Sequence, residues 1–161
     1  MPKLSHADMA KLLQARLSGK RYQHSLRVVD LALELAKYHN VEPDLAYEAA
    51  IWHDLAKELP IETQLVLAKE AGFPLDEVLL ANPALYHAPA ARVLAQKLGQ
   101  DSQDVLNAIA WHTLARPAMS SLEKIIYLAD AMEPGRNWQG LAEITEIAKN
   151  NLDVAMVKAL E

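Results

Sequence analysis

Helical periodicity runs through nearly all of this 161-residue chain and constrains its fold more than any other feature. Apolar residues recur at intervals of three and four, as in the stripe formed by Val28, Leu31 and Leu35. A half-buried strand would instead alternate apolar and polar residues, and the sequence contains no such run rich in β-branched residues. We therefore predict an all-α protein.

Glycines, prolines and capping residues divide this periodic sequence into separate helices. Ser5 followed by Asp8 resembles a capping box at the start of the first helix, and Gly19 is expected to end that helix. The pattern predicts helices over about 5–17, 20–38, 43–57, 61–71, 83–98, 103–113, 120–133 and 141–161. No linker, repeat array or low-complexity segment interrupts them, so we expect residues 1–161 to form a single domain.

The composition argues against several kinds of partner. The net charge is −5, whereas a general nucleic-acid binder neutralises phosphates with Lys and Arg, so we expect no nucleic-acid partner. Any phosphate-bearing ligand would need a local basic cluster. The sequence has no cysteine, and therefore no disulfide and no thiolate metal site. It shows neither a signal-peptide pattern nor an apolar run that approaches a membrane span, so we expect a cytoplasmic protein with no membrane partner.

Two hexamers, WHDLAK at 52–57 and WHTLAR at 111–116, share the pattern Trp-His-x-Leu-Ala-base. The first has Asp54 beside its histidine, and the second has Thr113. A carboxylate can ligate a metal or act as a base, whereas a threonine hydroxyl only forms hydrogen bonds. The two hexamers are therefore interpreted as similar helix ends with different roles.

Three of the expected helices place a side chain that can bind a metal on or beside an apolar face. His24 lies one turn before Val28 on the apolar stripe, the pair His53-Asp54 follows the stretch AAIW, and Asp130 follows IIYLA. A buried carboxylate is costly unless it is paired, protonated or bound to a metal. More ordinary roles remain open, because His24 alone could bond a backbone carbonyl and the His53-Asp54 pair could be solvated.

Imidazole and carboxylate ligands together suit iron, manganese, cobalt or zinc. The missing thiolates argue against a structural zinc site. These residues therefore predict a transition metal that takes part in chemistry.

Longer stretches around these residues carry a family resemblance. RYQHSLRV surrounds His24, WHDLAKE surrounds His53, YHAPAA contains His87, and WHTLARPAMSSLEKIIYLADAMEPGR covers much of the last third. Together with the H…HD…D pattern, they resemble the bacterial YqeK family of HD-domain metal-dependent phosphohydrolases, over nearly the whole chain. The resemblance implies a single-domain helical bundle of the HD type. It also implies iron as the metal and symmetrical hydrolysis of diadenosine tetraphosphate, or a related dinucleoside polyphosphate, to nucleoside diphosphates.

The resemblance also assigns roles to residues by position. Positions that match the family's metal ligands are His24, His53, Asp54 and Asp130. Positions that match its nucleotide-phosphate site are Arg21, Lys57, His87, His112, Thr113 and Arg136. Among these, Asp54, His87 and His112 are the expected catalytic residues. The Asp54 hexamer would thus serve the metal, and the Thr113 hexamer the substrate.

Spacing along the chain supports the phosphate-binding assignment. Arg21 lies three residues before His24 on nearly the same helix face, and Lys57 lies one turn past His53. Arg136 follows Pro134-Gly135, just beyond Asp130. These three cations would form the local basic cluster that an acidic chain needs for a polyphosphate. For each of them alone, a solvated surface charge remains the alternative.

Several alternatives stay open. His87 and His112 could ligate a second metal ion instead of contacting the substrate. The enzyme could hydrolyse mononucleotides or guanosine alarmones, or the protein could be a nucleotide sensor without turnover or a purely structural bundle. Members of the family usually extend past the position of Glu161, so we expect the chain to be short of the family's C-terminal segment. A homodimer is also open.

Overall fold

The structure, a computed structural model, describes residues 2–161 and contains only helices, turns and loops over that range, which confirms the all-α prediction. Its elements in chain order are α1 (His6–Arg16), α2 (Gly19–Tyr38), α3 (Pro43–Trp52), α4 (Ile61–Glu70), α5 (Glu77–Ala81), the 3₁₀ turn η1 (Pro83–Leu85), α6 (His87–Lys97), α7 (Gln103–Ala110), α8 (Ser121–Met132), α9 (Leu141–Asn150) and α10 (Leu152–Leu160).

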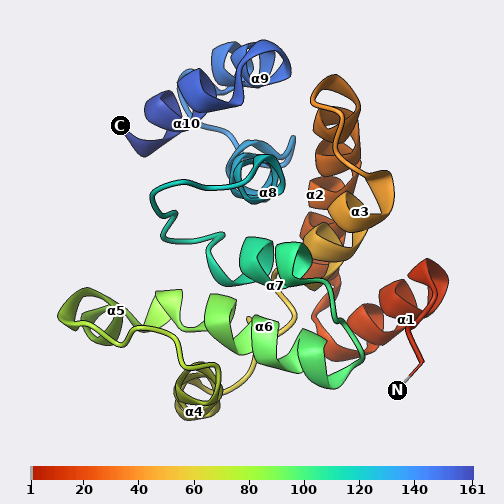
Figure 1. The fold of residues 1–161 in the computed structure, drawn as a ribbon, viewed down its shortest axis with the longest axis vertical. Coiled ribbons are helices and arrows are strands. Elements are labelled where there is room, and N and C mark those ends of the chain that lie inside the picture. Colours follow the sequence, from red (N-terminus) through yellow and green to blue (C-terminus); the bar gives the residue numbers. More distant parts are fainter. Residues whose placement is uncertain (1) are drawn as a thin grey trace.

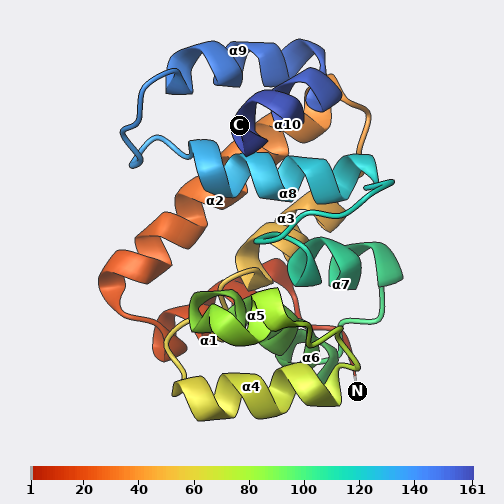
Figure 2. The same cartoon turned by 90° about the vertical axis from the view of Figure 1, so that its left-hand side faces the viewer.

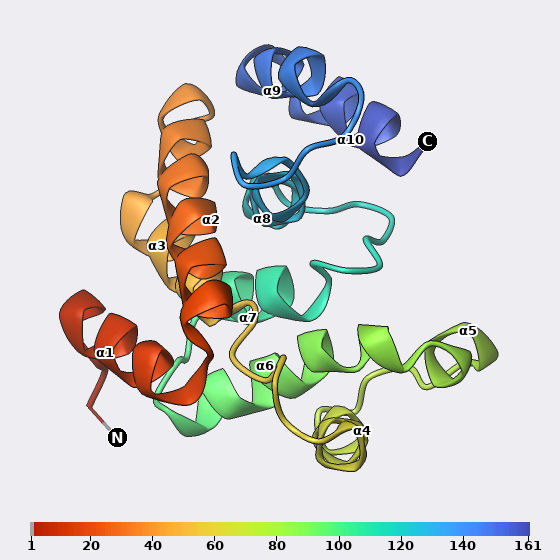
Figure 3. The same cartoon turned by 180° about the vertical axis from the view of Figure 1, so that it is seen from behind.

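Helix α8 lies in the middle of the molecule and packs against α2, α3 and α7 on one side and against α9 and α10 on the other. Helices α9 and α10 form one end of the molecule, and α4 with α5 forms the opposite end (Figures 1 and 2). The long helix α2 runs beside α3, as seen from behind in Figure 3. The interior of the molecule is therefore surrounded by five helices, α2, α3, α6, α7 and α8.

Aliphatic side chains fill the space between these helices. Leu35 of α2, Ile51 of α3, Ile109 of α7 and Ile126 of α8 are fully buried in one continuous cluster. A smaller cluster around Phe73 and the ring of Trp111 packs under α4 and α5. Most helices contribute aliphatic side chains to the core. These side chains, and not the polar groups at the centre, hold the helices together.

Both hexamers begin near a helix end, but the helices stop earlier than the sequence indicated. Helix α3 ends at Trp52 rather than Lys57, and α7 ends at Ala110 rather than Thr113. Beyond α3, the backbone continues with tighter i→i+3 bonds, from Leu55 N to Trp52 O at 3.0 Å and from Lys57 N to Asp54 O at 2.9 Å. Helical periodicity continues through such turns, so it could not reveal where the α-helix stops.

Other boundaries also differ from the prediction. Gly19 begins α2 instead of ending the first helix, because the Ser18 side chain caps the Arg21 amide. The expected last helix is two helices, separated at Asn151, which has extended backbone angles and caps Val154 N. The short helix α5 was not predicted, and the helix expected over 83–98 is the 3₁₀ turn η1 followed by α6. Capping side chains therefore determine helix boundaries that apolar periodicity alone could not predict.

None of the helices in residues 2–161 is both long and apolar enough to cross a membrane.

The core predicts which substitutions destabilise the fold. Leu35 is fully buried, so Leu35→Ala should lower the free energy of unfolding by about 2–5 kcal/mol through lost burial and the cavity left behind. Leu160 is 56% exposed, and Leu160→Ala should change stability by less than about 0.5 kcal/mol. Urea denaturation of both variants measures this, and equal losses would contradict the assignment of the core.

Candidate functional site

A buried carboxylate, that of Asp54, occupies the centre of the site. Only 4% of its side chain is exposed. Its Oδ2 atom lies 3.5 Å from His24 Nε2 and 3.5 Å from His53 Nε2, and Arg21 Nη1 donates to it at 3.1 Å. Asp130 of α8 completes this side, with Oδ1 at 3.0 Å from His24 Nε2 and 3.6 Å from His53 Nε2. The four side chains predicted to hold a metal therefore lie together.

Two further histidines face the other oxygen of the same carboxylate. Asp54 Oδ1 lies 3.2 Å from His87 Nε2 and 3.7 Å from His112 Nε2, and the two Nε2 atoms are 3.1 Å apart. His87 is the first residue of α6, and His112 follows the end of α7. Asp54 therefore stands between two groups of imidazoles, one at each oxygen.

Three of the four rings are oriented by the same backbone contact. The Nδ1 atoms of His53, His87 and His112 donate to the carbonyl three residues earlier, at 2.6, 2.8 and 2.7 Å respectively. A carbonyl can only accept, so the proton is on Nδ1 and a neutral ring presents the Nε2 lone pair to the site. This tautomer is the one in which Nε2 can bind a metal ion.

The fourth ring, that of His24, is oriented by a side chain that the sequence analysis did not identify. Glu133 Oε1 accepts from His24 Nδ1 at 3.1 Å, and Glu133 Oε2 accepts from Arg27 Nε at 2.6 Å and from Gly135 N at 2.6 Å. A Cβ at Gly135 would lie 2.7 Å from Arg27 Nη2, so a larger residue there would displace the Arg27 side chain. The signal was available, because Glu133 lies one helical turn after Asp130 and a buried His24 needs a partner for Nδ1.

Electrostatics keeps the carboxylates charged. Burial alone would raise the pKa of Asp54, but His53, His112 and His87 hold the pKa well below its usual range. Burial likewise opposes ionisation of Asp130, and its imidazole neighbours again keep the pKa well below the usual range. Burial lowers the pKa of His87. Burial would also lower the pKa of His53, but the carboxylates of Asp54 and Asp130 outweigh it and raise the pKa to about 9. The ionised carboxylates of Asp54 and Asp130 therefore stabilise positive charge at the centre of the cluster.

The donor set fits a metal ion. His53 Nε2 is buried and has no hydrogen-bond partner among residues 2–161. Two groups place their ligand atoms within 4.8 Å of one another, His24 with His53 and Asp130, and His53 with Asp54 and His112. The carboxylate oxygens and imidazole nitrogens that converge here need positive charge between them, which a proton on His53 or a metal ion can supply. Nitrogen and oxygen ligands of this kind suit first-row transition metals.

The cluster opens into a cavity of about 260 Å³. Eight of the ten residues predicted for the site line this cavity, and the other two, His24 and His53, lie behind Asp54 and Asp130. The eight are Arg21, Asp54, Lys57, His87, His112, Thr113, Asp130 and Arg136. Residues from six separate segments thus meet in one place, although what each of them does remains a prediction.

Polar and cationic side chains surround the cavity. The Arg136 guanidinium donates through Nε to the Asp130 carbonyl at 2.6 Å and through Nη2 to Asp130 Oδ1 at 3.1 Å. The hydroxyl oxygen of Thr113 is buried without a partner among residues 2–161. Tyr127 also lines the cavity and was not predicted. With Arg21 and Lys57, the cavity gathers three cationic side chains beside the metal-binding cluster.

Comparison with known proteins gives consistent results. The model of the HD domain family matches residues 21–135. The chain is 36% identical over 159 residues to the symmetrical bis(5'-nucleosyl)-tetraphosphatase of Bacillus subtilis, covering 98% of this chain and 85% of that one. The protein of the same name from Staphylococcus aureus is 34% identical over 143 residues, covering 87% and 72%.

A solved structure agrees with these relatives. It is described as that of a predicted HD superfamily hydrolase involved in NAD metabolism from Clostridium acetobutylicum. It superposes with a TM-score of 0.92 at 41% identity, and the match covers 98% of this chain and 84% of that one.

The contact between Glu133 and His24 generates a prediction. Glu133→Gln should preserve the fold and weaken metal affinity by about 10–100-fold, because the amide no longer holds the His24 Nδ1–H with a negative charge. Metal titration against a competing chelator measures the change. The control is Glu123→Gln, which alters a buried glutamate of α8 that pairs with Arg116 away from the cluster. Equal weakening in both variants would contradict the role given to Glu133.

Proposed function

The chain belongs to the HD domain family, and we propose that it hydrolyses diadenosine tetraphosphate or a related dinucleoside polyphosphate symmetrically, releasing two nucleoside diphosphates. The observation that carries the proposal is the Asp54 carboxylate, held among four imidazole Nε2 atoms beside a cavity with three cationic side chains. The names of the full-length relatives support the choice of substrate. The substrate would be a free small molecule in the cytoplasm.

We further propose that the cluster holds two metal ions. His24, His53, Asp54 and Asp130 would hold one ion, and His87 and His112, together with Asp54, would hold the other. The sequence left two arrangements open. We favour the one in which His87 and His112 ligate a second ion over the one with a single ion and a His112 that binds no metal. The two-ion arrangement is supported by the facing Nε2 atoms of His87 and His112, both of which are acceptors once Nδ1 carries the proton. Iron is the first candidate, with manganese, cobalt and zinc as alternatives.

When bound, such ions supply Lewis acidity, which neutralises charge on phosphoryl oxygens and makes water more acidic. The protein's own part is to position the phosphates. Arg21 and Arg136 already donate to Asp54 and Asp130, so their guanidinium planes are fixed and their remaining N–H groups can bind phosphate oxygens. Lys57 lies beside His87 in the same cavity, and the unpartnered Thr113 hydroxyl can donate to a phosphate oxygen.

The reaction needs only water as a second reactant. Water adds to one of the two central phosphorus atoms, and the bond from this phosphorus to the central bridging oxygen breaks. The bridging oxygen keeps the bonding electrons and leaves with the second nucleoside diphosphate, and the water's protons are released to the surroundings or to the products. The charge that develops on the phosphoryl and bridging oxygens lies where Arg21, Lys57 and Arg136 are placed.

Product analysis tests this proposal. Metal-replete protein given diadenosine tetraphosphate should yield ADP as its only nucleotide product by anion-exchange chromatography. ATP and AMP in equal amounts would mean asymmetric cleavage and would contradict the proposal. Release of phosphate from mononucleotides, or cleavage of guanosine alarmones in preference, would support the rival hydrolases. Binding without turnover in metal-replete protein would support a sensor.

Metal content tests the role of His112. With two ions, His112→Ala should lower the metal content from two to one per chain and reduce turnover, since a ligand of the second ion is lost. His6→Ala is the control, because His6 is exposed and faces Asp44 instead of the cluster. Metal analysis of identically prepared wild type and variants decides the question. An unchanged ratio with reduced turnover would restore the first interpretation, in which His112 contacts the substrate or donates a proton.

A further inference from the structure

The connection of residues 111–120, between α7 and α8, holds its backbone in an unfavourable conformation. Ala115 has φ 60° and Ala118 has φ 58°, in the left-handed region where the Cβ of an ordinary residue crowds the backbone. Strain of this kind persists only where the surrounding structure holds it in place. Here it lies directly after His112 and Thr113, which line the catalytic cavity.

The Arg116 side chain fastens this connection at both ends. Its Nε and Nη2 atoms donate to the two carboxylate oxygens of Glu123, each at 2.9 Å. Its Cζ atom lies 5.3 Å from the centre of the Trp111 ring, which is close enough for a cation–π contact. Trp111 directly follows α7, and Glu123 lies in the first turn of α8. One guanidinium therefore ties the two helix ends together across the strained residues.

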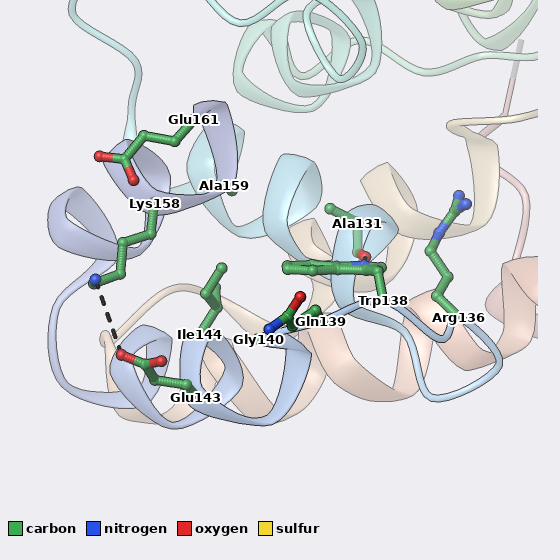
Figure 4. A pocket seen from close by; sticks show the side chains of 10 residues that line it. All are labelled: Ala131, Arg136, Trp138, Gln139, Gly140, Glu143, Ile144, Lys158, Ala159 and Glu161. Atoms are coloured by element: carbon green, nitrogen blue, oxygen red, sulfur yellow. Dashed lines mark hydrogen bonds and ion pairs between the residues drawn. The ribbon is translucent and has the colours of Figure 1, made fainter.

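Arg116 is not among the residues of the range 2–161 that line the catalytic cavity. Three other cationic side chains line it, namely Arg21, Lys57 and Arg136. Arg136 also lies at one end of a neighbouring hollow, where Figure 4 shows its guanidinium turned away from the other residues drawn. Lys57 is the last residue of the first hexamer, and Arg116 is the last residue of the second. The two hexamers therefore end in cations with different surroundings, one at the cavity and the other paired with α8.

Thr113 lies at the cavity in a turn that belongs to this connection. Ala115 N donates to the Trp111 carbonyl at 3.0 Å, which closes the turn around Thr113. The Thr113 hydroxyl oxygen is buried and has no partner within the described part of the chain, although a buried hydroxyl without a partner is costly. His112 is held separately, because its Nδ1 donates to a carbonyl of α7. A change in the connection should therefore move Thr113 more than it moves His112.

We propose that the 111–120 connection, held in its strained form by Arg116, positions the Thr113 hydroxyl to donate to a phosphate oxygen of the substrate. The inference rests on the proposed function. Arg116 is a positioning residue, because it contacts Trp111 and Glu123 and not the substrate. A hydroxyl that is fixed before the substrate binds has little freedom left to lose, so its hydrogen bond contributes more to binding and orientation.

Paired variants test whether Arg116 acts through Thr113. Thr113→Val removes the hydroxyl and should lower kcat/KM for diadenosine tetraphosphate by about 10-fold or more, the loss expected for one hydrogen bond to a charged group. Arg116→Lys keeps the charge without the paired hydrogen bonds, and it should cause a smaller loss at unchanged metal content. The double variant should match Thr113→Val, because both losses have the same origin. Arg92→Lys is the control and should stay near wild type, since Arg92 lies on α6 and donates to Asn107 outside the cavity.

Ala115→Gly tests the strain without removing a contact of Arg116. Glycine adopts this φ freely, so the midpoint of thermal unfolding should rise by about 2–4 °C. The same change should return kcat/KM of Arg116→Lys toward wild type, because a connection without strain needs less support. Ala15→Gly, at an exposed helical position of α1, should instead lower the midpoint.

Four results would each overturn the inference alone. They are losses that multiply in the double variant of Thr113 and Arg116, full activity of Arg116→Lys, no rescue by Ala115→Gly, and a midpoint that Ala115→Gly leaves unchanged or lowers. Absence of turnover in metal-replete wild type would overturn the proposed function, and the inference with it.

Discussion

The burial of one charged carboxylate, that of Asp54, is the constraint on which the rest of the site depends. Moving an ionised carboxylate out of water is costly, and it is tolerated only where opposite charge and hydrogen-bonding groups surround it. Here the surroundings are four imidazoles and the Arg21 guanidinium, supplied by segments far apart in the sequence. Helices α2, α6 and α7 must therefore all reach the end of α3 for the carboxylate to be accommodated.

The two hexamers are similar because each places a histidine just past the end of a helix. An ending helix leaves carbonyl groups without helical partners, and a histidine just past the last turn can satisfy one of them through Nδ1. His53 does so with Ala50 O, and His112 does so with Ile109 O. The contact fixes each ring, so that Nε2 of His53 faces Oδ2 of Asp54 and Nε2 of His112 faces Oδ1. The repeated pattern therefore encodes an oriented imidazole at a helix end, whereas the residue that follows it, Asp54 or Thr113, differs between the copies.

Some of this could be predicted from the sequence, and the limits have physical causes. Apolar spacing of three and four predicted an all-helical chain, because it reports which face of a helix is buried. It did not locate the ends of α3 and α7, since tighter turns continue the same spacing for several residues. Polar side chains beside apolar stretches indicated His24, His53, Asp54 and Asp130, and the family resemblance supplied the other candidates, whose roles stay predictions. Glu133 was missed because a glutamate at a helix end is ordinary on a surface, although its place one turn after Asp130 was a signal.

Symmetrical cleavage does not require a symmetrical site. A substrate with two identical ends and four phosphates is the same from either end, so recognition of one end is sufficient. Arg21 and Arg136 are held by hydrogen bonds to Asp54 and Asp130, so phosphates bound to their remaining N–H groups would lie beside the cluster. If these groups hold the two phosphates next to one end of the substrate, the central bond lies at the cluster, and both products carry two phosphates.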